Sequence, residues 1–248
     1  MMQLIESTKE MFRDSRFLRK ALMIACPVAL QGMLNTVVNL VDTLMIGTMG
    51  ATAIAAVGLA NKFFFVFSLL VFGIVSGSGV LAAQFWGNGD LRSIRKVLGL
   101  SILLALTGAL FFVVPALVSP QSVMRIFTTS HDSVELGSKY LKIAVLTYPF
   151  LAMTNVYVAI LRAVNKVIFP VISSCIAIVI NICLNYVLIF GKLGMPAMGV
   201  SGAAVATLIA RIIEIVLLTA PSATGTMWLL FSQRNMKPAM WRPLSQDM

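Results

Sequence analysis

The sequence predicts an all-α integral membrane protein whose six transmembrane helices form one lobe. Of its 248 residues, 59% are hydrophobic and only 11% are charged. The mean hydropathy is +0.94. A water-soluble domain of this size could not bury so much apolar surface, and a disordered chain would be far more polar. The third observation is that the apolar residues fall into six long segments.

A membrane-spanning helix needs about 20 mostly apolar residues. Six segments meet this length and define a predicted lobe over residues 21–219: about 21–46, 54–85, 97–119, 139–161, 167–190 and 199–219. Residues 1–20 mix apolar and charged side chains, which predicts an amphipathic segment on the cytoplasmic membrane surface. Residues 220–248 form an atypical tail that is too short for a soluble domain.

Glycine and proline mark the boundaries between these segments. Turns are expected at Gly47–Gly50, at Gly87–Asp90 and over Gly191–Gly199, because glycine-rich stretches favour turns. Pro115 and Pro120 end the third segment, and Pro170 begins the fifth, where a missing N–H is tolerated.

Lys and Arg predict the orientation, because basic residues collect in cytoplasmic loops. With both termini inside, the inner segments carry Lys9, Arg13, Arg16, Arg19, Lys20, Arg92, Arg95, Lys96, Arg162, Lys166, Arg234, Lys237 and Arg242. The outer segments carry only Arg125, Lys139, Lys142 and Lys192. We therefore expect both termini in the cytoplasm. The net charge of +10 then indicates topology and gives no reason to expect a nucleic-acid partner.

Polar side chains inside a membrane usually face a bundle interior or a water-filled cavity. Four stand out: Asp42, Asn181, Asn185 and Thr207. Helix lengths at 1.5 Å per residue place all four in the outer half of the bundle. A carboxylate, two amides and a hydroxyl suit Na⁺ or a proton. The alternative for the two asparagines is simple hydrogen bonding between helices.

Other intramembrane polar residues are weaker candidates. Asn35 and Asn39 precede Asp42 by two turns and one turn, and could line its cavity or join helices, the latter being favoured. Arg211 and Glu214 are three residues apart and are expected to pair locally in a structural role. The sequence has no phosphate-binding loop, zinc motif or nucleophile elbow, so we predict neither an enzyme nor a cofactor.

The ordered set of motifs resembles the multidrug and toxic compound extrusion (MATE) transporters over about residues 11–219. The matching stretches are Pro27, VDTLMIGTMGATAIAAVGLA from Val41 to Ala60, GIVSGSGVLAAQFWGNGD from Gly73 to Asp90, LRAVNK before Pro170, NICLNYVLIFG from Asn181 to Gly191, and MGVSGAAVAT from Met198 to Thr207. Their order and spacing together are specific.

The resemblance implies secondary active export of cationic amphipathic drugs in exchange for Na⁺ or H⁺ across the bacterial inner membrane. Asp42 matches the family's acidic residue in helix 1. Asn181, Asn185 and Thr207 match its positions in helices 5 and 6. Tyr140 and Pro27 match a tyrosine of helix 4 and the proline that bends helix 1. Some members have an aspartate at the second helix 5 position, so Asn185 leaves the choice of coupling ion open.

The family has twelve helices in two lobes with the substrate cavity between them, whereas this chain resembles the N-terminal lobe only. We expect it to act with a second lobe or a second copy of itself in the lipid bilayer. One alternative is a truncated, non-functional fragment of such a transporter. Another is a six-helix membrane protein similar to a lipid-linked sugar flippase, for which more charge in the cavity would be expected.

Overall fold

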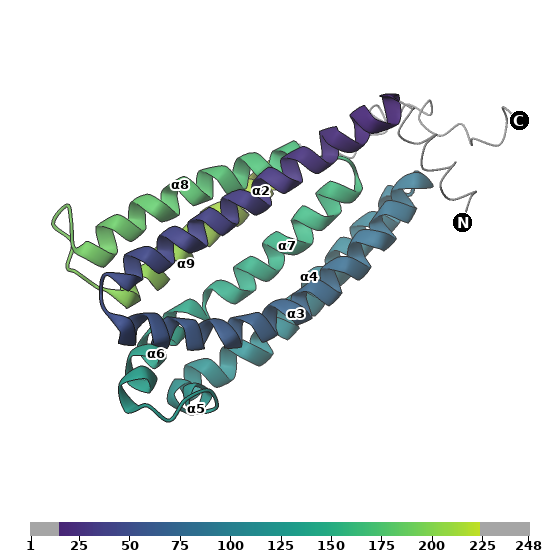
Figure 1. Ribbon diagram of the computed structural model, residues 1–248. Coiled ribbons are helices and arrows are strands. Elements are labelled where there is room, and N and C mark those ends of the chain that lie inside the picture. The colour runs from purple at the N-terminus through teal and green to yellow at the C-terminus, as the bar shows by residue number, and fades with distance from the viewer. Residues whose placement is uncertain (1–14, 224–248) are drawn as a thin grey trace, which may run out of the picture.

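The computed structural model describes residues 15–223, and its regular secondary structure in this range is entirely helical (Figure 1). The helices are α2 (Ser15–Gly47), α3 (Ala51–Gly87), α4 (Leu91–Val118), α5 (Pro120–Arg125), α6 (His131–Ala144), α7 (Thr147–Ala163), α8 (Ile168–Phe190) and α9 (Val200–Ala223). The predicted all-α class is therefore confirmed. The helix α2 already includes Ser15, so it begins before residue 21. Residues 1–14 and 224–248 of the two predicted terminal segments lie outside the described range.

Five described helices are long and apolar enough to cross a membrane: α3, α4, α8, the Ala25–Gly47 part of α2 and the Val200–Ala220 part of α9. A sixth span forms if α6 and α7 count as one, but these two helices are bent by 48°. The predicted span over 139–161 therefore corresponds to a bent pair, in which α6 ends at Ala144 and α7 begins at Thr147. Pro149 explains the break, because it has no N–H for the carbonyl four residues earlier and its ring clashes there.

The helices form two layers (Figure 1). The first, which we call the α2 layer, contains α2, α8 and α9, with α8 packed along both of its neighbours. The second, the α3 layer, contains the antiparallel pair α3 and α4. The helix α7 packs on α3, α4 and α9, and α6 packs on α3 and α9, so the bent pair joins the layers. Direct contact between α2 and α3 is slight.

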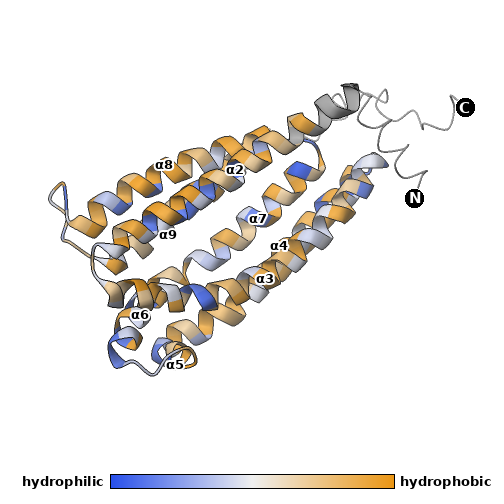
Figure 2. Cartoon of the chain, viewed as in Figure 1, coloured by the Kyte–Doolittle hydropathy of each residue, from blue (hydrophilic) through white to orange (hydrophobic). Residues whose placement is uncertain are grey.

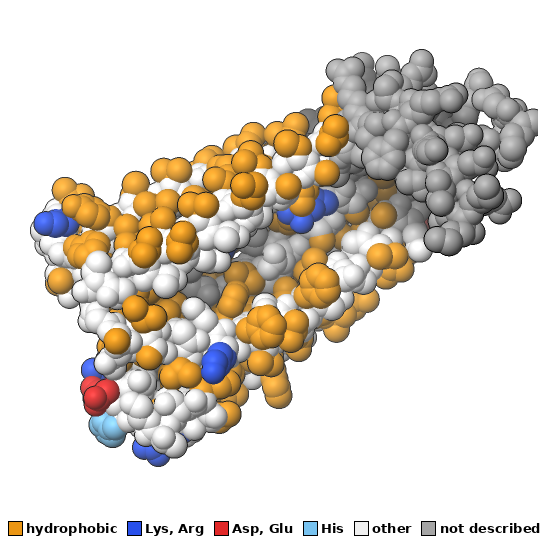
Figure 3. Space-filling view, in the orientation of Figure 1, with side chains coloured by type: hydrophobic (Ala, Val, Ile, Leu, Met, Phe, Trp, Pro, Cys, Tyr) orange, Lys and Arg blue, Asp and Glu red, His pale blue; other side chains and the backbone are white. Residues whose placement is uncertain are grey.

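An aromatic cluster packs the α3 layer against α7. The rings of Phe67 and Tyr148 stack with centroids 4.4 Å apart, and Phe63 meets Phe112 edge-on at 5.3 Å. The outward faces are also apolar, as Figures 2 and 3 show, and Phe111 is 74% exposed. Apolar residues on both sides of a helix are typical of a membrane protein, in which the outer face contacts lipid.

Asp90 secures the turn between α3 and α4. Its carboxylate accepts hydrogen bonds from the Ser93 hydroxyl at 2.5 Å and from the Ser93 backbone N–H at 3.0 Å. These bonds cap α4 and hold the pKa of Asp90 below its usual value.

The helices α8 and α9 approach closely at Gly202. A Cβ atom at this position would lie 2.6 Å from the carbonyl oxygen of Leu188, a backbone atom that cannot move aside. The same carbonyl accepts a hydrogen bond from the Met198 backbone N–H at 2.9 Å. Gly202 therefore allows the contact that brings the polar residues of α8 and α9 together.

We expect Gly202→Ala to destabilise the fold by about 1–3 kcal/mol, because the added methyl group overpacks the contact with Leu188. The measurement is the midpoint of thermal unfolding of the purified protein. Gly99→Ala is the matched control, because a Cβ there would meet no atom within 4 Å. Equal midpoints for the two variants would show that the close approach is unimportant.

Candidate functional site

Asp42 of α2 meets Asn185 of α8 inside the α2 layer. The Nδ2 of Asn185 donates a hydrogen bond of 2.5 Å to Oδ1 of Asp42. Asn185 is completely buried, whereas Asp42 is only partly buried. The bond joins two helices whose contacting residues lie far apart in sequence.

Asn181 and Thr207 extend this contact to α9. The Nδ2 of Asn185 also lies 3.3 Å from Oδ1 of Asn181, one helical turn away. The Nδ2 of Asn181 donates to the hydroxyl of Thr207 at 3.4 Å. Because that hydroxyl gives its own proton to the Ala203 carbonyl at 3.0 Å, its oxygen acts as an acceptor. The structure thus brings the four predicted residues into one cluster from three helices, which we call the Asp42 cluster.

Two oxygen atoms of the Asp42 cluster lack hydrogen-bond donors. The Oδ1 of Asn185 is buried and has no partner among the described residues. Within residues 15–223, Oδ2 of Asp42 accepts no hydrogen bond either. Buried polar atoms are nearly always paired, so the buried Asn185 carbonyl is unusual. A carboxylate, an amide carbonyl and a hydroxyl are the oxygen donors that hard cations prefer. The cluster is thus suited to a small cation or a proton.

The Asp42 cluster opens into cavities between the two layers. Asp42 and Thr207 line a cavity of about 290 Å³ together with Asn39, Tyr140 and Arg211. They also line an adjoining cavity of about 190 Å³ with Asn35, Asn39, Asn181 and Arg211. Figure 3 shows a hollow between the layers on one face of the molecule.

The remaining predicted residues occupy different positions. Tyr140 of α6 is half-buried in the larger of these two cavities. Asn35 and Asn39 line cavity walls, and their side chains make no hydrogen bond within the described part of the chain, which disfavours the interpretation that they join helices. Pro27 is half-buried and lines none of the cavities described here, and α2 continues through it without a break.

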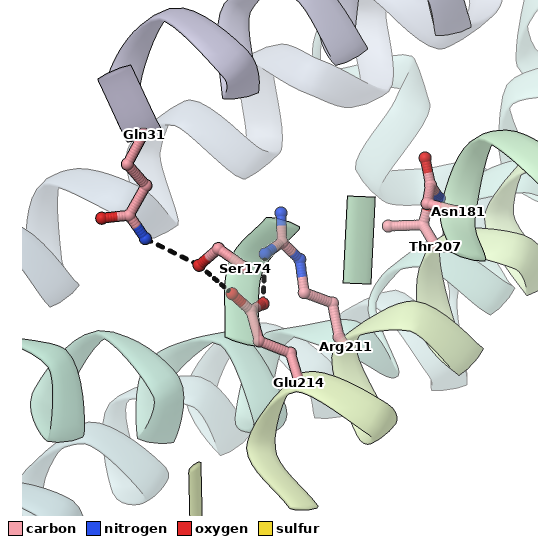
Figure 4. Close-up of polar contacts among 6 residues, drawn as sticks. All are labelled: Gln31, Ser174, Asn181, Thr207, Arg211 and Glu214. Carbon is pink, nitrogen blue, oxygen red and sulfur yellow. Dashed lines mark hydrogen bonds and ion pairs between the residues drawn. The ribbon is translucent and has the colours of Figure 1, made fainter. Parts of the chain in front are cut away.

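A second polar network lies closer to the start of α2 (Figure 4). The guanidinium NH2 of Arg162 donates to Oε1 of Gln31 at 2.7 Å, and Nε2 of Gln31 donates to the Ser174 hydroxyl at 2.6 Å. That hydroxyl donates to Oε1 of Glu214 at 2.6 Å, and NH1 of Arg211 lies 2.6 Å from Oε2 of Glu214. We call these five residues the Glu214 network.

The pairing of Arg211 with Glu214 was predicted, but Gln31, Ser174 and Arg162 were missed. Helical spacing could have indicated two of them. Gln31 precedes Asp42 by eleven residues, and Ser174 precedes Asn185 by the same interval, which is close to three turns. Gln31 therefore lies on the same face of α2 as Asp42, and Ser174 lies on the same face of α8 as Asn185. Figure 2 shows hydrophilic residues interrupting the apolar helices of this layer.

Sequence comparison links the chain to known proteins. The family model of MatE matches residues 27–187. The chain is 31% identical over 205 residues to the probable multidrug resistance protein NorM of Thermotoga maritima, covering 82% of this chain and 44% of that relative. It is also 31% identical over 192 residues to the multidrug resistance protein MdtK of Pectobacterium atrosepticum, covering 76% and 41%. The chain thus spans less than half the length of these relatives.

Solved structures share the fold. A MOP superfamily transporter from Pyrococcus furiosus superposes with a TM-score of 0.76 at 23% identity, covering 84% of this chain and 45% of that one. A MATE transporter in the bent conformation gives 0.75 at 22% identity, covering 89% and 49%. Together with the multi-pass helices and the family match, these comparisons show that the chain is a membrane protein that belongs to the MatE transporter family.

Proposed function

We propose that this chain forms the N-terminal half of a cation-coupled multidrug exporter, and that the Asp42 cluster binds the coupling ion, Na⁺ or H⁺. The observation that carries the proposal is the unpartnered buried carbonyl of Asn185 beside the carboxylate of Asp42. A cation would give both groups the partner that they lack in the described structure. The names of the relatives support multidrug export as the activity.

The mechanism follows from competition for one carboxylate. The larger cavity beside Asp42 is lined by both apolar and polar residues, which suits an amphipathic cation. A drug cation and a coupling cation are each attracted to Asp42, and binding of one disfavours the other through charge repulsion. Exchange of the two across the membrane would produce antiport.

A complete exporter would need a second lobe facing the cavities. The chain spans 44% of the NorM relative, which leaves room in that relative for another unit of similar size. We propose that the lobe pairs with such a unit, either a separate second lobe or another copy of itself, within the lipid bilayer.

Asp42→Asn is expected to abolish drug export because it removes the carboxylate that attracts both cations. The measurement is dye efflux from cells lacking their own drug pumps, with membrane insertion checked for each protein. Asp132→Asn is the matched control, since Asp132 is exposed at the start of α6. Imposed Na⁺ and proton gradients would identify the coupling ion. Unchanged efflux in Asp42→Asn would remove Asp42 from the mechanism. If no efflux occurs from the correctly inserted chain under either gradient, export by this chain alone is excluded.

Asn185→Leu should weaken Na⁺ binding about tenfold or more, because it removes a carbonyl ligand and the hydrogen bond to Asp42. Equilibrium binding of radioactive Na⁺ to the purified chain measures this effect. Tyr186→Leu, on the exposed side of the same helix, is the control and should bind normally. The assignment of Asn185 fails if both variants bind Na⁺ with the parent's affinity.

A further inference from the structure

Arg211 lies between two carboxylates that belong to different clusters. It lines both cavities that contain Asp42, and it also lines the cavity of about 340 Å³ that contains Gln31, Ser174 and Glu214. Figure 4 shows its guanidinium group between the Ser174–Glu214 pair and the Asn181–Thr207 pair. Along α9, Arg211 is about 6 Å beyond Thr207 and about 4.5 Å before Glu214. Arg211 therefore shares cavity walls with two carboxylates, those of Asp42 and Glu214.

Glu214 holds Arg211 in its present position. The Glu214 side chain is 3% exposed, and each of its oxygens is bonded: Oε1 by the Ser174 hydroxyl and Oε2 by Arg211. Ser174 is itself fixed, because it accepts from Gln31 while giving its only proton to Glu214. A carboxylate held in this way has one defined geometry, and it directs NH1 of Arg211 away from the Asp42 cluster.

The remaining nitrogens of the Arg211 guanidinium are available to bind a second anion. Its other nitrogens make no hydrogen bond with residues 15–223, and the side chain is 31% exposed. Asp42 lines the same two cavities as Arg211, and its Oδ2 has no donor in the described structure. A guanidinium that pairs with Asp42 would neutralise the carboxylate and so disfavour a second cation there.

We propose that Arg211 is a tethered competitor for the cation site at Asp42, and that Glu214 is the positioning residue that keeps it off the site. This inference rests on the proposed function, because it takes Asp42 as the ion-binding carboxylate. Glu214 thereby keeps the affinity of Asp42 for the coupling ion high without contacting the ion. The Glu214 network, which spans α2, α7, α8 and α9, fixes Glu214 and so keeps Arg211 in this position.

The test is equilibrium binding of radioactive Na⁺ to the purified 248-residue chain and its variants. In Glu214→Gln, Arg211 loses its anionic partner and turns to Asp42, so the dissociation constant for Na⁺ should rise about tenfold or more. In Arg211→Gln the competitor is gone, and binding should be at least as tight as in the parent. The double variant Arg211→Gln/Glu214→Gln should match Arg211→Gln, because Glu214 acts only through Arg211.

The outcomes separate this inference from the proposed function. If the parent, Asp42→Asn and Arg211→Gln proteins all fail to bind Na⁺, the proposed Na⁺ site is overturned. If the parent and Glu214→Gln bind Na⁺ with the same affinity, only the competitor role of Arg211 is overturned. If the double variant binds Na⁺ as weakly as Glu214→Gln, that role is also overturned, because the loss of affinity would then not depend on Arg211. If Glu214→Gln does not fold, an Arg211→Gln protein that binds more weakly than the parent contradicts the inference.

Discussion

Inside a lipid bilayer a polar side chain cannot turn to water, and it must find its partners within the protein. This constraint explains the organisation of the α2 layer. The hydrogen bond between Asp42 and Asn185 joins α2 to α8, and Asn181 continues the contact to Thr207 on α9. The Glu214 network makes a second connection across the same three helices and adds α7. Polar groups therefore hold together the layer whose outer surface is apolar.

The two layers are stabilised by different means. The α3 layer packs within itself and against α7 through aromatic rings and small residues, and Phe67 of α3 stacks on Tyr148 of α7. The α2 layer relies on the close approach at Gly202 and on polar contacts. The bent pair of α6 and α7 connects them, and slight contact between α2 and α3 leaves the intervening cavities. The site thus lies at a boundary between two kinds of packing.

Hydropathy was sufficient to predict the helical class and the general positions of the helices, because lipid demands long apolar segments. It missed the break between α6 and α7, since Pro149 alters local geometry without altering hydropathy. The Asp42 cluster was predicted because carboxylate and amide groups are rare within apolar helices. Ser174 and Gln31 were missed, although Gln31 also carries an amide, because their importance depends on what other helices place beside them. Arg162 was assigned to an inner loop, and only the fold shows that it reaches Gln31.

The pairing of Asp42 with an amide at position 185 has a consequence for the energy source of the proposed transport. Within the Asp42 cluster there is one acidic side chain, so the cluster can neutralise one positive charge at a time. Exchange of one monovalent ion for one singly charged drug would transfer no net charge across the bilayer. The membrane voltage, worth about 2.3 kcal/mol per charge at 100 mV, would then contribute nothing to the exchange. In the proposed exporter, exchange through this lobe would then draw on the concentration gradient of the ion alone and would continue in a depolarised cell.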